Sequence, residues 1–166
     1  MVVVTVVMNS LTVDEYRLRR FRTGGIGGYV EMMRVAACQT EEIFGDVGAA
    51  VRVVHDFAGC TEAAGSDLLL FPECFLQGYL VTEEHVRGQA LAVGSPECDE
   101  VLARLAGIRP MLVFGMIERD GGAFYNTALV VAGGRVLGRY RKMFLTAGET
   151  VFTAGRDYPV FDCGTI

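Results

Sequence analysis

The chain has 166 residues, of which 51% are hydrophobic, and its formal net charge is −5 at pH 7. It is long enough for one domain with a buried core, whereas the acidic balance and the scattered cations argue against a nucleic-acid partner. The apolar run at residues 2–7 is far too short to span a bilayer and lacks the flanks of a signal peptide, so no membrane partner is expected.

Residues 1–32 do not share the pattern of the rest of the chain. Glycine pairs at 24–25 and 27–28 favour a loosely ordered N-terminal extension, and a short docking helix over residues 11–21 is the alternative. These glycines do not make a dinucleotide-binding loop, because the third glycine of that motif would fall on Val30. A domain is therefore predicted for residues 33–166.

The predicted domain begins with a β-α-β unit. Residues 35–38 form a short buried strand, and Asp46 can cap a helix whose apolar positions repeat at helical spacing as far as Gly65. Residues 68–71 form the second strand, which ends at Pro72 because proline has no N–H to donate. Such crossovers usually produce neighbouring parallel strands.

Two helices and three strands are predicted after this unit. One helix follows Thr82, and another begins at Ser95 and Pro96, which suit the cap and the first turn, and ends at Pro110. The apolar run at 111–117 predicts a buried strand, and glycine turns join it to strands at 125–131 and 135–140 that should pair antiparallel. The predicted fold class is therefore α/β with a mixed sheet.

Three ionisable residues that could act in catalysis follow predicted strands: Glu73, Glu118 and Lys142. Strand ends are where ligands collect in sheets flanked by helices, so we expect these side chains to share a site. Glu73 lies between Phe71 and Phe75, where desolvation would raise its pKa and suit a general base. Lys142 is the only lysine among 15 lysines and arginines. The ordinary alternative is a structural ion pair at the sheet margin.

Cysteine and histidine usage narrows the chemistry. Five cysteines, odd in number and without CxxC spacing, favour free thiols in a reducing, cytoplasmic compartment over a disulfide framework. His55 and His85 have no partner at metal-ligand spacing, so no metal site is expected. A base carboxylate, an ammonium and a second carboxylate suit acyl transfer through a thiol, with the ammonium stabilising the oxyanion.

Four segments resemble consecutive signatures of the nitrilase superfamily of carbon–nitrogen hydrolases: MRVAACQT at 33–40, LLFPE at 69–73 with GY at 78–79, FGMIE at 114–118 with YNT at 125–127, and RYRK at 139–142. The resemblance implies a four-layer α-β-β-α sandwich, association into homo-oligomers, and a small-molecule amide, carbamoyl or nitrile substrate without any cofactor. It also implies that Glu73 is the general base, that Lys142 stabilises the oxyanion, and that Glu118 supports the lysine and the substrate.

The nucleophile is the point where the chain departs from this resemblance. In the family the catalytic cysteine follows the lysine on a later apolar strand, and no such segment is present before Ile166. Cys163 and Cys74 are the alternatives, although an ordinary buried thiol explains both. We expect residues 33–166 to be a truncated domain that lacks its C-terminal part and is inactive alone; a non-catalytic binding or assembly module that retains the fold is the other reading.

Overall fold

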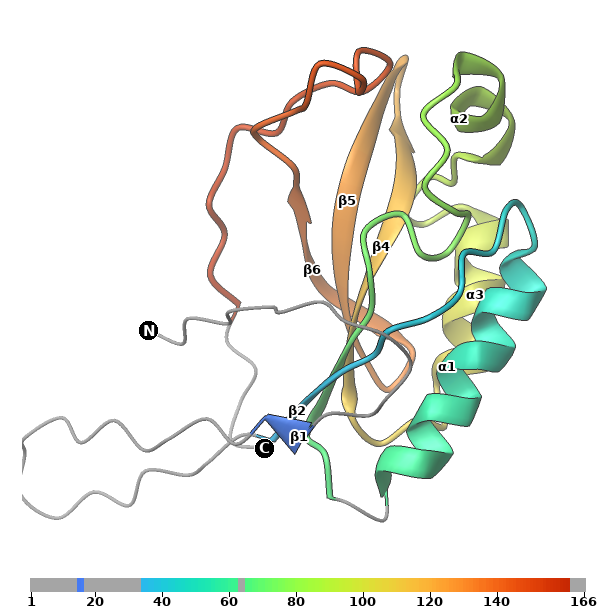
Figure 1. Cartoon of the computed structure of the whole chain (residues 1–166), viewed down its shortest axis with the longest axis vertical. Coiled ribbons are helices and arrows are strands. Elements are labelled where there is room, and N and C mark those ends of the chain that lie inside the picture. Colours follow the sequence, from blue (N-terminus) through green and yellow to red (C-terminus); the bar gives the residue numbers. More distant parts are fainter. Residues whose placement is uncertain (1–14, 17–33, 63–64, 162–166) are drawn as a thin grey trace, which may run out of the picture.

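A computed structural model describes residues 15–16, 34–62 and 65–161 (Figure 1). Its elements are β1 (Glu15–Tyr16), β2 (Val35–Ala37), α1 (Val47–Glu62), β3 (Leu68–Leu70), α2 (Glu83–Gln89), α3 (Pro96–Leu105), β4 (Met111–Asp120), β5 (Ala123–Ala132) and β6 (Arg135–Arg141). The strands form one sheet in the order β1-β2-β3-β4-β5-β6. Strands β2, β3 and β4 run parallel, and the other neighbours pair antiparallel. The predicted mixed α/β class is confirmed.

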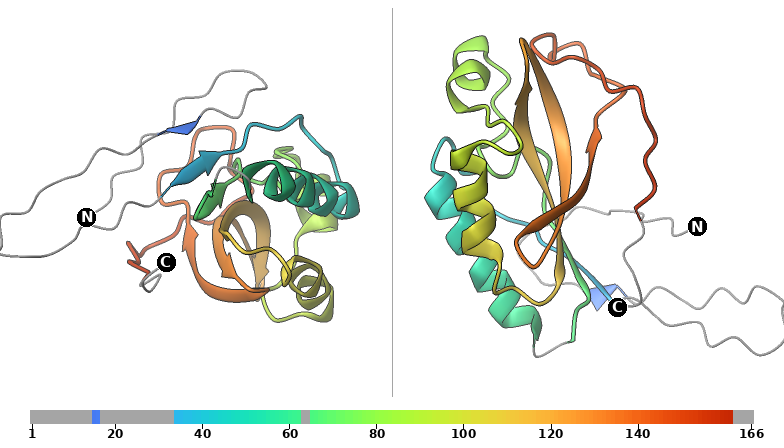
Figure 2. Two further views of the ribbon diagram at one scale, coloured as in Figure 1. Left: turned by 90° about the horizontal axis from the view of Figure 1, so that it is seen from below. Right: turned by 180° about the vertical axis from the view of Figure 1, so that it is seen from behind.

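Helices α1 and α3 lie along one face of this sheet (Figures 1 and 2). The core between them and the sheet is apolar and includes the fully buried Leu69, Leu105 and Leu112. The two helices are also joined directly, because the His55 Nε2 atom lies 3.0 Å from the carbonyl oxygen of Arg104. The described residues thus form a helix layer on a sheet layer, and the opposite face of β3–β6 is left for the site.

The signals that predicted the helices act as expected. The Asp46 side chain accepts a hydrogen bond from the Ala49 amide at the start of α1, and the Ser95 side chain accepts one from the Cys98 amide at the start of α3. Strand β4 continues to Asp120, beyond the predicted end at residue 117. This extension places Glu118 inside a strand instead of at its end, with consequences described below.

Little of the predicted N-terminal extension is described. Glu15–Tyr16 pair antiparallel with β2, and the remainder of residues 1–32 lies outside the described residues, so both accounts of that segment stay predictions. Within the described part of the chain, no helix is long and apolar enough to cross a membrane.

Candidate active site

A tight turn after β3 positions Glu73. Strand β4 holds this turn through two backbone hydrogen bonds, from the Gly115 amide to the Pro72 carbonyl oxygen and from the Leu76 amide to the Gly115 carbonyl oxygen, both 3.0 Å long. Cys74 has a φ of 50° in this turn, a left-handed conformation that is uncommon for a residue with a side chain. The Glu73 carboxylate is thereby turned outward and its side chain is 48% exposed.

Lys142 meets two carboxylates, one of which is Glu73. Its Nζ atom lies 3.1 Å from Glu73 Oε2 and 3.0 Å from Glu149 Oε1. The Lys142 amide also donates to the Asn126 carbonyl oxygen over 2.8 Å, which fixes the lysine backbone as it leaves β6. The structure therefore brings together Glu73 and Lys142, as the sequence predicted, and adds a second carboxylate from the following loop.

Asn126 lies between the same two carboxylates. Its Nδ2 atom donates to Glu73 Oε2 over 3.0 Å and to Glu149 Oε1 over 3.1 Å. The Thr146 amide donates to the other Glu149 oxygen, Oε2, over 2.8 Å. Among the described residues, Glu73 Oε1 is the carboxylate oxygen of this group that no hydrogen bond occupies.

The charges of this group stabilise one another. Burial opposes the ionised form of Glu149, but hydrogen bonds from the Thr146 amide, Lys142 and Asn126 outweigh it and lower the pKa of Glu149 to about 2. Burial also opposes the charged form of Lys142, but its hydrogen bonds to Glu149 and Glu73 prevail and raise its pKa. At neutral pH the group thus holds one ammonium and an ionised Glu149. Burial, together with the charge of Glu149, raises the pKa of the neighbouring Tyr79.

Glu149 should make stability depend on pH. Its folded-state pKa of about 2 lies below the ordinary 4.5, so the ionised carboxylate stabilises the fold above about pH 4.5 and this contribution is lost as the pH falls through about 2. We expect the free energy of unfolding to decrease across that window in the wild-type protein, and to decrease less in Glu149→Gln. Urea unfolding at several pH values measures both slopes, and parallel slopes would contradict the assignment.

A cavity of about 220 Å³ adjoins this group. Glu73, Asn126 and Lys142 lie on its wall. The rest of the lining is mainly apolar and comes from the end of β3 and the turn after it, and from β4, β5 and β6: Leu70, Phe71, Pro72, Val113, Gly115, Thr127, Ala128 and Tyr140. A cavity with few polar groups on an apolar wall is typical of a small-molecule site.

Glu118 lies on the opposite face of the sheet from Lys142, contrary to the sequence-based expectation. Side chains alternate along a strand, and Glu118 pairs with Tyr125 across β4 and β5, whereas Asn126 faces the other way. The Glu118 side chain is fully buried and accepts hydrogen bonds from Thr127 over 2.7 Å, from Arg141, and from Arg139. Glu149, and not Glu118, is the second carboxylate on Lys142.

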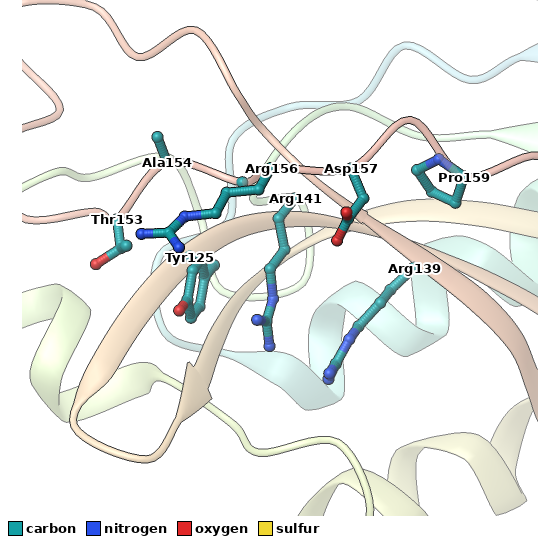
Figure 3. A pocket seen from close by; sticks show the side chains of 9 residues that line it. Tyr125, Arg139, Arg141, Thr153, Ala154, Arg156, Asp157 and Pro159 are labelled. Atoms are coloured by element: carbon teal, nitrogen blue, oxygen red, sulfur yellow. The ribbon is translucent and has the colours of Figure 1, made fainter.

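The arginines of Glu118 line a second cavity, of about 380 Å³. Figure 3 shows the side chains of Arg139 and Arg141 extending in the same direction from β6. The Arg141 guanidinium lies 3.7 Å from the centre of the Tyr125 ring and 2.6 Å from Asp120. The hydrogen bonds to Glu118 and Asp120 raise the pKa of Arg141. Carboxylates already pair with both of these arginines, and Arg156 and Asp157 also line the cavity, which lacks the lysine held between two carboxylates found beside the first.

None of the described cysteines offers a thiol to the site. Cys38, Cys74 and Cys98 are buried, and Cys60 is exposed on α1. Cys74 is closest to the site in sequence, but burial and the charge of Glu73 raise the pKa of its thiol to about 12. Cys163 lies outside the described residues.

Sequence reasoning missed Glu149 and the role of Asn126. Glu149 lies in a loop rich in glycine and threonine, where the sequence offers no periodicity to predict burial. Its side chain is nevertheless fully buried. An available signal was the single lysine seven residues earlier, since a loop returning after Lys142 can place a carboxylate against it.

Comparisons with known proteins bear on this geometry. The model of the family "Carbon-nitrogen hydrolase" matches residues 34–166. The chain is 30% identical over 151 residues to a bifunctional nitrilase/nitrile hydratase of Lupinus angustifolius, covering 78% of this chain and 43% of that protein. It is 33% identical over 113 residues to the glutamine-dependent NAD(+) synthetase of Mycobacterium tuberculosis, covering 68% of this chain and 17% of that protein.

The chain is also similar to a solved structure. That structure is of a mutant amidase from Nesterenkonia sp. AN1 in which acrylamide has added to the active-site cysteine. The two structures superpose with a TM-score of 0.65 at 26% sequence identity, covering 80% of this chain and 54% of the amidase. The chain thus spans less than half the length of the plant nitrilase relative and about half of the amidase.

Proposed function

Because the chain belongs to the carbon–nitrogen hydrolase family, we propose that its site serves the hydrolysis of a carbon–nitrogen bond in a small amide, carbamoyl or nitrile substrate. The observation that carries this proposal is one ammonium, Lys142, held between Glu73 and Glu149 at the wall of a largely apolar cavity. An exposed structural ion pair needs neither a second, fully buried carboxylate nor a cavity beside it.

Each group has a role in this proposal. Glu73 accepts the proton of a thiol through Oε1, the oxygen left unoccupied, while the sulfur attacks the carbonyl carbon of an amide. The Lys142 ammonium stabilises the oxyanion, and Glu149 keeps that ammonium charged and in place. The carbon–nitrogen bond then breaks, the amine leaves with the proton from Glu73, and water hydrolyses the thioester with Glu73 again as base.

The cavity limits the substrate. Its volume of about 220 Å³ is below the usual range for drug-sized ligands, and its lining is apolar apart from a few groups at one side. We expect a short, uncharged acyl group or nitrile in this space, with the carbon that is attacked close to Lys142. Apart from Glu73 and Lys142, which pair with each other, the described residues of the wall include no charged group to pair with a charged substrate.

The nucleophile in this proposal is a cysteine from outside the described residues. The Nesterenkonia amidase reacts with acrylamide at its active-site cysteine. The thiol of Cys74 is unsuited to that role, because it is buried and its pKa is raised to about 12. Cys163, or a cysteine supplied by a further segment, would have to approach Glu73 and Lys142.

Acrylamide labelling tests the proposal. The chain should carry Cys60→Ser, because the exposed Cys60 thiol would react without any site. With Cys163 as the nucleophile, we expect an adduct by intact mass, located by peptide mapping, that forms about tenfold more slowly in Glu73→Gln, since the base is lost. Glu84→Gln removes an exposed carboxylate in α2 and should leave the rate unchanged.

Two results would count against the proposal with Cys163 as the nucleophile. An adduct that forms at the same rate in Glu73→Gln would mean that this carboxylate does not activate the thiol. No adduct at all would exclude a nucleophile within this polypeptide, Cys163 included, and is the result that both the truncated domain and the non-catalytic binding or assembly module predict.

A further inference from the structure

Asn126 occupies a position in the site that the proposed chemistry leaves unexplained. Its Nδ2 atom and the Lys142 Nζ atom each contact the same two oxygens, Glu73 Oε2 and Glu149 Oε1. The four contacts form a closed ring in which every edge measures 3.0 or 3.1 Å. One side of this ring is a charged donor and the other is a neutral one.

Asn126 is the member of the ring that lies within a strand of the sheet. It lies within β5, which pairs with β4 on one side and β6 on the other, and it is 4% exposed. Its carbonyl oxygen accepts the Lys142 amide over 2.8 Å. Glu73, by contrast, lies in a turn with its side chain 48% exposed. A buried strand residue thus donates a hydrogen bond to the exposed carboxylate of a turn.

The choice of an amide follows from the charges. Glu73 and Glu149 share one ammonium, so a third carboxylate in place of Asn126 would leave three anions around one cation. The amide donates two hydrogen bonds without changing the charge, and both of its N–H groups have a carboxylate to bind. This arrangement also determines the amide orientation, because an amide oxygen facing both carboxylates would be repelled.

We infer that Asn126 is a positioning residue that holds Glu73 and Glu149 at a fixed separation about Lys142 and keeps Glu73 Oε1 free to accept a proton. The inference rests on the proposed function, because that function gives the free oxygen its task. Asn126 contacts no reacting atom in this account. It acts by holding Glu73 Oε2 against the lysine, which leaves Glu73 Oε1 as the unpaired oxygen.

The single lysine makes this coupling measurable. Selective ¹³C labelling of lysine gives one side-chain resonance, that of Lys142, whose pH titration reports its pKa without substrate. We expect Glu73→Gln to lower that pKa by about one unit in the wild-type background. In an Asn126→Ala background the same change should lower it by less than half as much, because Glu73 is no longer held against the lysine.

Thr127→Val is the matched control. It removes a buried hydrogen bond from the adjacent residue of β5, on the opposite face of the sheet, and should leave the coupling of Glu73 to Lys142 at its full wild-type value. If Asn126→Ala does not fold, Asn126→Asp keeps the shape and should raise the pKa of Lys142 by adding a third carboxylate.

Equal Glu73→Gln shifts in the wild-type and Asn126→Ala backgrounds would overturn the positioning role, as would an unchanged lysine pKa in Asn126→Asp. These measurements are independent of turnover. If acrylamide does not label the protein, but Glu73→Gln lowers the Lys142 pKa in the wild-type background and does so less in the Asn126→Ala background, the results count against the proposed function with Cys163 as the nucleophile and not against this inference.

Discussion

Replacing Gly115 with alanine should lower the free energy of unfolding by at least about 4 kcal/mol and displace Glu73. A Cβ atom at this position would lie 2.2 Å from the Cys74 amide nitrogen and 2.4 Å from the Glu73 Cα atom. Both are backbone atoms, so no side-chain rotation relieves the overlap. The turn and β4 would have to separate, which also breaks the hydrogen bonds to Pro72 and Leu76. Denaturant unfolding followed by circular dichroism measures the loss.

Gly59→Ala is the matched control for this substitution. Gly59 is exposed within α1, and a Cβ atom there would have no heavy atom within 4 Å. Alanine in a helix interior should raise the free energy of unfolding by about 0.5–1 kcal/mol, because glycine loses more backbone entropy on folding. A Gly115→Ala protein as stable as wild type would show that the turn carrying Glu73 does not approach β4 this closely.

The meeting of Glu73 with Lys142, 69 residues apart, could be predicted because local signals place both. Proline ends β3 just before Glu73, and strand periodicity carries the chain through β6 to Lys142. The β-α-β pattern predicted β2 and β3 as parallel neighbours, and the structure adds β4 as a parallel neighbour of β3. Short-range rules were sufficient here, since each residue follows directly from the end of a regular element.

The remainder of the site could not be predicted in this way. Glu149 lies in a loop without periodicity, and contacts with Lys142, Asn126 and the Thr146 amide fix it there. The placement of Glu118 depended on where β4 ends, and three additional strand residues moved it from the strand end into the ladder. Side-chain alternation then decided its face, and Thr127 and two arginines on that face satisfy its charge.

Replacing Glu118 with glutamine should lower the free energy of unfolding by about 3–5 kcal/mol. The carboxylate is fully buried and is paired with Arg139 and Arg141, whose side chains are 39% and 20% exposed. Glutamine preserves the size but removes the charge, so Asp120 alone would remain to compensate the two cations. The cost comes mainly from these uncompensated, partly buried charges. Urea unfolding at neutral pH provides the comparison with wild type.

Glu83→Gln shows what an exposed ion pair is worth in the same chain. Glu83 pairs with Arg87 one helical turn away over 2.8 Å, and both side chains are largely exposed, so loss of this pair should cost less than about 0.5 kcal/mol. A Glu118→Gln cost as small as that of Glu83→Gln would contradict the buried network.

The lysine resonance separates the two buried carboxylates, Glu149 and Glu118. Glu149→Gln should lower the pKa of Lys142 by about one unit, whereas Glu118→Gln should leave that pKa unchanged. A lysine pKa that changes with Glu118 instead would restore the role expected from the sequence.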